Sequence, residues 1–189
     1  MIFLASRSPR RLALLQQIGI QPAVLDIDLP EVRAVGEPPL DYVSRVARGK
    51  AGLGLMNVAA QPGALVLAAD TEVIVDDAVL GKPEDVADAA RMLRLLSGRT
   101  HTVASVVWLV SAGSEASAQS VSEVRFGEID DAAIQRLLDG GDWQGKAGGY
   151  AIQGRAAAFI EHLSGSYSGV MGLPLFETRR LLQASGVLA

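Results

Sequence analysis

The chain has 189 residues, and its 17 basic and 21 acidic side chains give a formal net charge of −4. Hydrophobic residues make up 49% and charged residues 20%, which is too apolar for a disordered protein and typical of a globular one. No cysteine is present, which excludes disulfide scaffolds, thiolate metal sites and cysteine nucleophiles. Two histidines are too few for a His-rich zinc centre, and the acidic balance argues against a general nucleic-acid binder.

The hydropathy pattern predicts no membrane contact. The longest uncharged run, residues 51–69, is interrupted by Asn57, Gln61, Pro62 and Gly63, so we interpret it as a helix end, a turn and a strand. The first apolar residues precede the first arginines, whereas a secretory signal has the opposite order. We therefore expect a cytoplasmic protein.

Short apolar runs alternate with helical patterns along the first half of the chain. Ser8 and Pro9 are typical of a helix N-cap and first helical residue, and Gly19 of a helix end. Strands are predicted at residues 2–5, 24–27, 65–69, 71–75 and 78–80, and helices at residues 9–18 and 41–56. The Asp76-Asp77 pair between the last two of these strands predicts a hairpin.

The second half of the chain repeats this alternation. Helices are predicted at residues 85–97, 130–139 and 174–184, and strands at residues 102–110, 120–126 and 156–163, with a turn at 111–117 and a glycine-rich segment at 140–154. Strands alternating with helices indicate an α/β sheet. No linker is long enough to separate two domains, so we expect one domain over residues 1–189.

The segment between the first strand and the first helix has the composition of an anion site. Ser6, Arg7, Ser8, Arg10 and Arg11 gather hydroxyls and guanidinium groups at a helix N-terminus, where free N–H groups favour phosphate. The alternative is a plain N-cap with solvated arginines.

An acidic residue and a lysine follow in the next strands. Asp70 is predicted at the C-terminal end of an apolar strand, where α/β sheets place catalytic groups, and a carboxylate there can accept a proton or hold Mg²⁺. Lys82, between Gly81 and Pro83, stands on a stiff turn from which it can reach a phosphate. The alternatives are a turn-capping Asp and an exposed turn Lys.

Three further features are a basic cluster, a glycine-rich segment and two histidines. Arg45, Arg48 and Lys50 form a basic cluster that is usually a solvated helix face. The glycine-rich segment fits neither the Walker nor the Rossmann spacing, but its Gln153 can donate to and accept from a nucleobase edge. His101 has no second histidine or acid at ligand spacing, and nor does His162, so both are interpreted as structural.

Five segments in order resemble the successive motifs of the Maf family of nucleotide pyrophosphatases. They are LASRSPRRLALL, SRVARGKA, AADTEVIVDDAVLGKP, GKAGGYAIQG and GSYSGVMGLPL. The resemblance implies a fold similar to the inosine triphosphate pyrophosphatases, with an elongated mixed sheet, flanking helices and two lobes around a cleft. It also implies hydrolysis of a nucleoside triphosphate to the monophosphate and pyrophosphate, with Mg²⁺ or Mn²⁺, in a homodimer.

Within the family, the chain resembles the branch that acts on dTTP and UTP. Thr71 and Gln153 match that branch, whereas the sister branch for 7-methyl-GTP carries Gln after the Asp and Glu near position 153.

The resemblance also implies roles for individual residues. Asp70 would be the general base and, with Glu31, would hold the metal, although the sequence around Glu31 departs from the commoner acid-rich version. The phosphates would be bound by Ser6, Arg10, Arg11, Lys50 and Lys82. Base specificity would depend on Arg10, Thr71 and Gln153.

Two hypotheses that involve no enzymatic activity remain as alternatives. One is a nucleotide-binding regulator of cell division without turnover, since the family has been associated with septum inhibition. The other is a nucleic-acid binder, against which the net charge, the 5% aromatic content and the lack of a basic stripe argue.

Overall fold

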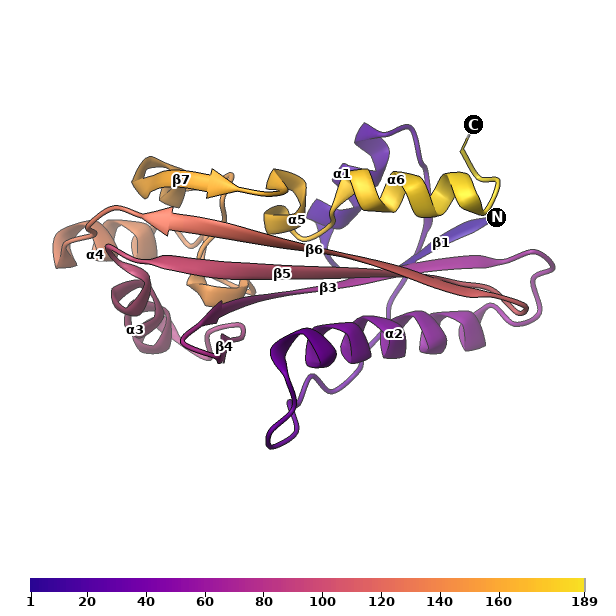
Figure 1. Ribbon diagram of the computed structural model, residues 1–189, viewed down its shortest axis with the longest axis horizontal. Helices are drawn as coiled ribbons and strands as arrows, with labels where there is room; N and C mark the ends of the chain where they lie inside the picture. The colour runs from indigo at the N-terminus through magenta and orange to yellow at the C-terminus, as the bar shows by residue number, and fades with distance from the viewer. Residues whose placement is uncertain (189) are drawn as a thin grey trace. The chain divides into compact units, whose positions relative to one another are not determined.

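A computed structural model describes residues 1–188 of the chain as a mixed α/β protein (Figure 1). The strands are β1 (Ile2–Ala5), β2 (Ala23–Leu25), β3 (Leu65–Val75), β4 (Ala78–Leu80), β5 (Thr100–Val110), β6 (Glu115–Phe126) and β7 (Ile160–Ser164). The α-helices are α1 (Pro9–Gln17), α2 (Pro39–Asn57), α3 (Val86–Leu96), α4 (Asp131–Asp139), α5 (Tyr167–Met171) and α6 (Leu175–Ala184). Two short 3₁₀ helices cover Ala147–Gly149 and Arg155–Phe159.

The seven strands form one sheet in the order β2-β1-β3-β5-β6-β7, with β4 paired to β3. β1 runs parallel to β2 and to β3, whereas the β3–β4 and β6–β7 pairs are antiparallel. The sheet is therefore mixed, which confirms the predicted α/β class.

The residues fall into two compact units, and β3, β5 and β6 each contribute to both. Unit 1 comprises Met1–Asp70, Ser105–Ser120 and the residues from Gly172 onward. Unit 2 comprises Thr71–Ala104 and Val121–Met171. Each unit has its own apolar core.

In unit 1, α2 and α6 lie on opposite sides of the strands (Figure 1). The approach of α2 is close, because a Cβ built on Gly54 would stand 2.8 Å from Val66 and 2.9 Å from Ala5. Glycine at this position therefore lets the helix approach the sheet more closely than any other residue would. The core beneath it includes Phe3 and Ala51.

In unit 2, α3 and α4 cover the core with apolar faces of helical period. Leu93, Leu96 and Ile134 pack in one cluster with Val73 and Phe126. Asp85 and Asp130 cap the two helices by accepting backbone hydrogen bonds of 2.7 Å from the third residue beyond each.

Most predicted elements are confirmed, including the hairpin, where Asp76 and Asp77 take φ values of 48° and 62° as a tight turn requires. Two predictions are wrong, and one helix was missed. β3 continues through Asp70 to Val75, because the β-branched run after Asp70 extends the strand. Residues 156–163 are a 3₁₀ helix followed by β7, and α5 was not predicted.

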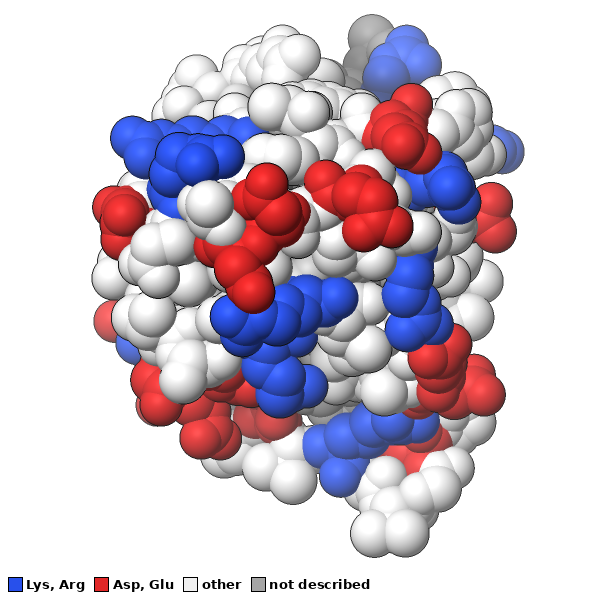
Figure 2. Space-filling model, turned by 90° about the vertical axis from the view of Figure 1, so that its left-hand side faces the viewer, with Lys and Arg blue, Asp and Glu red and all other residues white. Residues whose placement is uncertain are grey.

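The charges of the protein are intermixed on the face that Figure 2 shows. In unit 2, exposed ion pairs join Arg94 to Asp131 and Arg125 to Glu161, with N–O distances of 2.8 Å. Such exposed pairs contribute about 0–1 kcal/mol each, so the cores carry the stability. Among residues 1–188, no helix has the length and apolar character needed to cross a membrane.

Candidate active site

The turn from β1 into α1 is built around the Ser6 hydroxyl. Ser6 Oγ accepts hydrogen bonds from the Ser8 backbone N–H at 3.1 Å and from Arg11 Nη1 at 3.3 Å. Arg11 Nε donates to the Gly172 carbonyl at 2.8 Å. Ser8 caps α1 as predicted, whereas Arg7 pairs with Asp26 and Asp28. Ser6 and Arg11 are therefore held in one place at a helix N-terminus.

Arg10 belongs to the same segment, and one nitrogen of its side chain, Nε, is buried without a hydrogen-bond partner among the residues described. Burial and, to a lesser extent, the adjacent charge of Arg11 lower the pKa of Arg10 to about 10, so it remains cationic at neutral pH. A buried donor of this kind costs about 1–3 kcal/mol unless something binds it, and a bound anion would do so.

The side chain of Lys50 joins two acidic residues. Lys50 Nζ lies 2.7 Å from Asp70 Oδ1 and 2.6 Å from Glu31 Oε1. Lys50 is on α2, Asp70 is within β3, and Glu31 is in the segment before α2, where the Tyr42 hydroxyl donates to its carbonyl oxygen at 3.1 Å. The predicted base, metal-site acid and phosphate-binding lysine thus form one contact group.

Asp70 has one satisfied and one unsatisfied carboxylate oxygen. The residue is only 4% exposed, and its Oδ2 is buried with no hydrogen-bond partner among the residues described. Since a buried carboxylate oxygen needs a partner, Oδ2 is a natural acceptor for a proton or a ligand for a cation.

The donor set fits a divalent cation bound together with substrate. Within residues 1–188, no cluster of three or more His, Asp or Glu side chains has the geometry to hold a metal. Mg²⁺, however, is usually bound by one or two carboxylates plus waters and substrate phosphates. Asp70 and Glu31, brought within reach of one ammonium group, supply such a pair.

The remaining predicted site residues belong to unit 2. Thr71 is half-buried in β3, and Lys82 and Gln153 are exposed. The Gly148 N–H donates to the Gly81 carbonyl at 3.1 Å, so the segment that carries Gln153 is bonded to the residue before Lys82. The turn lysine and the glycine-rich segment are thereby neighbours within this unit.

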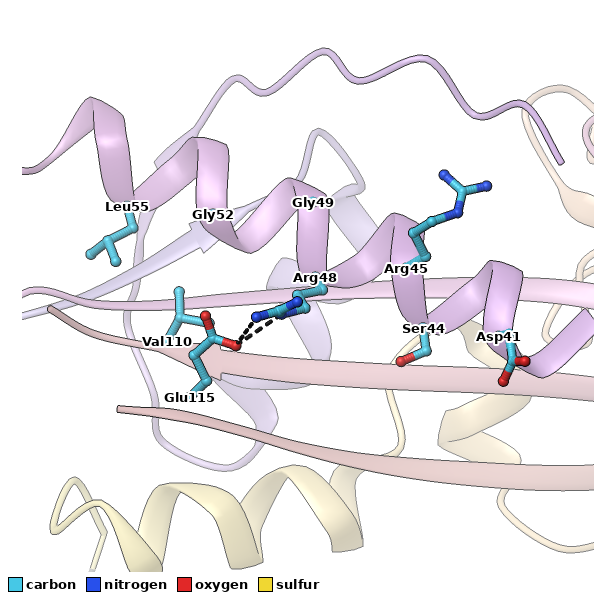
Figure 3. A pocket seen from close by; sticks show the side chains of 9 residues that line it. All are labelled: Asp41, Ser44, Arg45, Arg48, Gly49, Gly52, Leu55, Val110 and Glu115. Atoms are coloured by element: carbon cyan, nitrogen blue, oxygen red, sulfur yellow. Dashed lines mark hydrogen bonds and ion pairs between the residues drawn. The ribbon is translucent and has the colours of Figure 1, made fainter. Parts of the chain in front are cut away.

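A pocket of about 580 Å³ lies on another face of α2 (Figure 3). Its lining includes Arg45, Arg48, Gly52 and Leu55, which recur at helical spacing, and Arg48 Nη2 pairs with Glu115 at 2.7 Å. Lys50 is two residues from Arg48, or about 200° around the helix. The pocket contains none of the predicted site residues. The basic cluster is therefore not one solvated face, because Lys50 is buried while Arg45 and Arg48 are exposed.

Sequence reasoning missed two parts of this geometry. It did not predict that Lys50 bridges Glu31 and Asp70, although its position opposite Arg48 on a helix was a usable signal. It also did not predict that the Gly172 carbonyl holds Arg11, although Gly172 lies in the fifth motif, GSYSGVMGLPL, because the motif does not show which distant residue its backbone contacts.

Comparisons with known proteins identify the family of the chain. A family model described as Maf-like protein matches residues 1–185. A "dTTP/UTP pyrophosphatase" of Xanthomonas euvesicatoria pv. vesicatoria (strain 85-10) is 56% identical over 98% of this chain and 99% of its own. A "Nucleoside triphosphate pyrophosphatase" of Xylella fastidiosa (strain M23) is 52% identical over 96% and 97%. The Ham1 protein of Staphylococcus aureus matches with a TM-score of 0.45 and 13% identity over 66% of this chain and 71% of its own. The family match spans nearly the whole chain and includes every residue of the contact groups described above, and the chain therefore belongs to the Maf-like family.

Proposed function

We propose that the protein hydrolyses dTTP and UTP to the monophosphate and pyrophosphate. The observation that carries the proposal is Asp70, whose Oδ2 is buried and unsatisfied while Oδ1 is fixed by Lys50. The name of the 56% identical relative, dTTP/UTP pyrophosphatase, supports these two substrates, and the name of the 52% identical relative supports a nucleoside triphosphate in general. The proposal extends to modified pyrimidine nucleotides as substrates of the same site.

Asp70 Oδ2 accepts a proton from the attacking water, and the oxygen of this water then attacks the α-phosphorus. A carboxylate within hydrogen-bond reach of water is the usual general base for such an attack. Lys50 holds the carboxylate in one orientation through its 2.7 Å contact to Oδ1. The water oxygen bonds to the α-phosphorus as the bond to the bridging oxygen breaks, and pyrophosphate leaves.

The phosphates are bound by Ser6, Arg10, Arg11 and Lys50 of unit 1. A triphosphate carries about four negative charges, and cations aimed at the charge that develops in the transition state lower the barrier. The buried, unsatisfied Nε of Arg10 supports its assignment to a phosphate oxygen.

Asp70 and Glu31 would hold Mg²⁺ or Mn²⁺. When bound, the cation neutralises phosphate charge and polarises the phosphoryl oxygens. The single charge of Lys50 offsets only one of the two carboxylates, and its ammonium group has three N–H donors, so Lys50 can keep its contact to Asp70 and still donate to a phosphate oxygen.

Three residues of unit 2 complete the proposal, and their support is the family resemblance. Lys82 binds a phosphate, and Thr71 and Gln153 select the base together with Arg10. The amide of Gln153 can both donate and accept, which matches the N–H and C=O groups on the edge of uracil or thymine.

A hydrolysis screen tests the proposal. Pyrophosphate release would be measured for the common and 7-methylated nucleoside triphosphates, with Mg²⁺ or Mn²⁺. We expect dTTP and UTP to have the highest kcat/KM, and Gln153→Glu to weaken that preference. A preference for 7-methyl-GTP would assign the chain to the sister branch. Nucleotide binding without pyrophosphate release would favour the regulatory alternative.

We also propose a cytoplasmic homodimer. The pairing of β7 with β6 begins at Glu123, so the earlier part of β6 lies at the sheet edge. Its residues 116–120 carry no charge and no proline, the features that usually prevent edge strands from pairing with other chains. Antiparallel pairing of two such edges is self-complementary about a twofold axis.

A further inference from the structure

The glycine-rich segment that carries Gln153 packs on the core of unit 2 through several buried residues, and one of them, Tyr150, also makes a buried side-chain hydrogen bond to the sheet. Tyr150 is 6% exposed and His101 of β5 is 2% exposed. The Tyr150 hydroxyl and His101 Nε2 share a hydrogen bond of 2.7 Å. The proposed reaction uses neither residue.

The rings around this hydrogen bond form a packed aromatic triangle. His101, Phe126 and Tyr150 meet edge to face, with centroid distances of 5.2 Å for His101–Phe126, 5.5 Å for His101–Tyr150 and 4.9 Å for Phe126–Tyr150. Such pairs add to the area that the rings bury, so the Tyr150 ring has a defined place even without its hydroxyl. The hydroxyl additionally fixes the orientation of the Tyr150 ring, because its hydrogen bond has a defined direction toward Nε2 of the His101 side chain.

Only two residues separate Tyr150 from Gln153, and the backbone that follows Gln153 is held by hydrogen bonds. Ala151 and Ile152 are buried, and the Gly154 N–H donates to the Ala151 carbonyl at 3.0 Å, which closes a turn. Next to it, the Arg155 N–H donates to Asp142 Oδ2 at 3.0 Å. Gln153 therefore stands exposed at the tip of a turn whose entry is set by Tyr150.

We propose that the His101–Tyr150 pair is a positioning device for Gln153 and thus contributes to the choice of nucleobase. An amide can discriminate between bases only if its donor and acceptor are held at defined positions. Both partners of the hydrogen bond stay neutral near pH 7, since burial lowers the pKa of His101 to about 4 and raises the pKa of Tyr150. The proposal rests on the function proposed above, in which Gln153 contacts the base.

The test is the Tyr150→Phe variant, which removes the hydroxyl and keeps the ring. We expect the variant to fold and the kcat/KM preference for dTTP and UTP over the other nucleotides to fall about threefold to tenfold, the effect of one hydrogen bond. The change should lie mainly in KM for dTTP and UTP. Tyr167→Phe, at an exposed tyrosine of the same unit, is the matched control and should leave the ranking unchanged.

A double variant separates positioning from stability. In a Gln153→Ala background, Tyr150→Phe should cause no further loss of preference, because the amide that it positions is gone. An unchanged ranking in Tyr150→Phe, or an equal loss for every nucleotide, would overturn the proposal. A wild-type protein without preference for dTTP and UTP would instead overturn the proposed function, so the two failures are distinguishable.

Discussion

At the scale of single residues, Lys50 is the centre of the proposed site. Its side chain is 10% exposed, that of Asp70 is 5% and that of Glu31 is 24%. One ammonium group between two carboxylates leaves a net negative charge, which a divalent cation or a proton can balance. The same three groups therefore suit both a resting state without substrate and a bound state in which Lys50 contacts phosphate.

Replacing Lys50 by Met should destabilise the protein by about 3 kcal/mol, because it leaves Asp70 with an uncompensated buried charge. Arg48→Met is the matched control on the same helix. Arg48 and Glu115 are 59% and 47% exposed, so loss of their ion pair should cost less than about 1 kcal/mol. Urea unfolding of both variants measures the difference, and equal losses would contradict the buried bridge.

The buried His101 predicts a pH dependence of stability. Burial lowers the pKa of His101 in the folded protein to about 4, from an ordinary value of 6.5. Between these values the unfolded chain binds the proton and the folded protein does not, so stability falls as pH falls from 6.5 towards 4. The loss should be about 1–3 kcal/mol larger in the wild type than in His101→Gln. Parallel stability curves for the two proteins would show that His101 titrates normally.

At the scale of elements, α2 positions Lys50 because glycine allows the helix to approach the sheet. Its three glycines argue against a stable helix by propensity, yet the helix extends from Pro39 to Asn57. The packing of Gly54 against Val66 and Ala5 explains why tertiary contacts override propensity there.

Two glycine substitutions in α2 should therefore have opposite effects. Gly54→Ala gains helix propensity but places a Cβ 2.8 Å from Val66, so we expect a net destabilisation of about 1–3 kcal/mol. A Cβ on Gly52 meets no atom within 4 Å, so Gly52→Ala should stabilise the protein by about 0.5–1 kcal/mol. Thermal unfolding distinguishes these signs, and stabilisation by both substitutions would refute the close approach.

Sequence patterns predicted the elements better than the place of each site residue within them. The β-branched residues after Asp70 extend β3, so Asp70, which was expected at a strand end, lies inside the strand. Lys50 is close to Arg45 and Arg48 in sequence, but the helical turn places it on a different, buried face of α2. The order of the motifs predicted which residues belong to the site. The contacts of Lys50 with Glu31 and Asp70, and of Arg11 with the Gly172 carbonyl, depend on tertiary packing and were not predicted.

At the scale of the whole molecule, a net charge of −4 is compatible with an anionic substrate. The placement of the charges explains this: Arg10, Arg11 and Lys50 lie in one unit, whereas exposed acids such as Asp131 and Glu161 pair with arginines elsewhere on the surface. The average charge argues only against a long anionic polymer.

The proposed dimer is also a property of the whole molecule. Ser117→Lys places a charge within the uncharged part of the β6 edge, and we expect the mass measured by light scattering to fall from two chains to one. Ala112→Lys, in the turn before β6, is the control and should keep the wild-type mass. A wild-type monomer, or a Ser117→Lys dimer, would exclude this edge as the interface.

The most direct test of the account is pyrophosphate release from dTTP and UTP by the wild type and by Asp70→Asn, at saturating Mg²⁺. Asn keeps the size of the side chain and can still contact Lys50 through its amide oxygen, but it cannot accept the proton of water. We predict a variant that folds and binds nucleotide with turnover lowered about 100-fold or more. Near-normal turnover in Asp70→Asn would contradict the assignment of Asp70 as the general base.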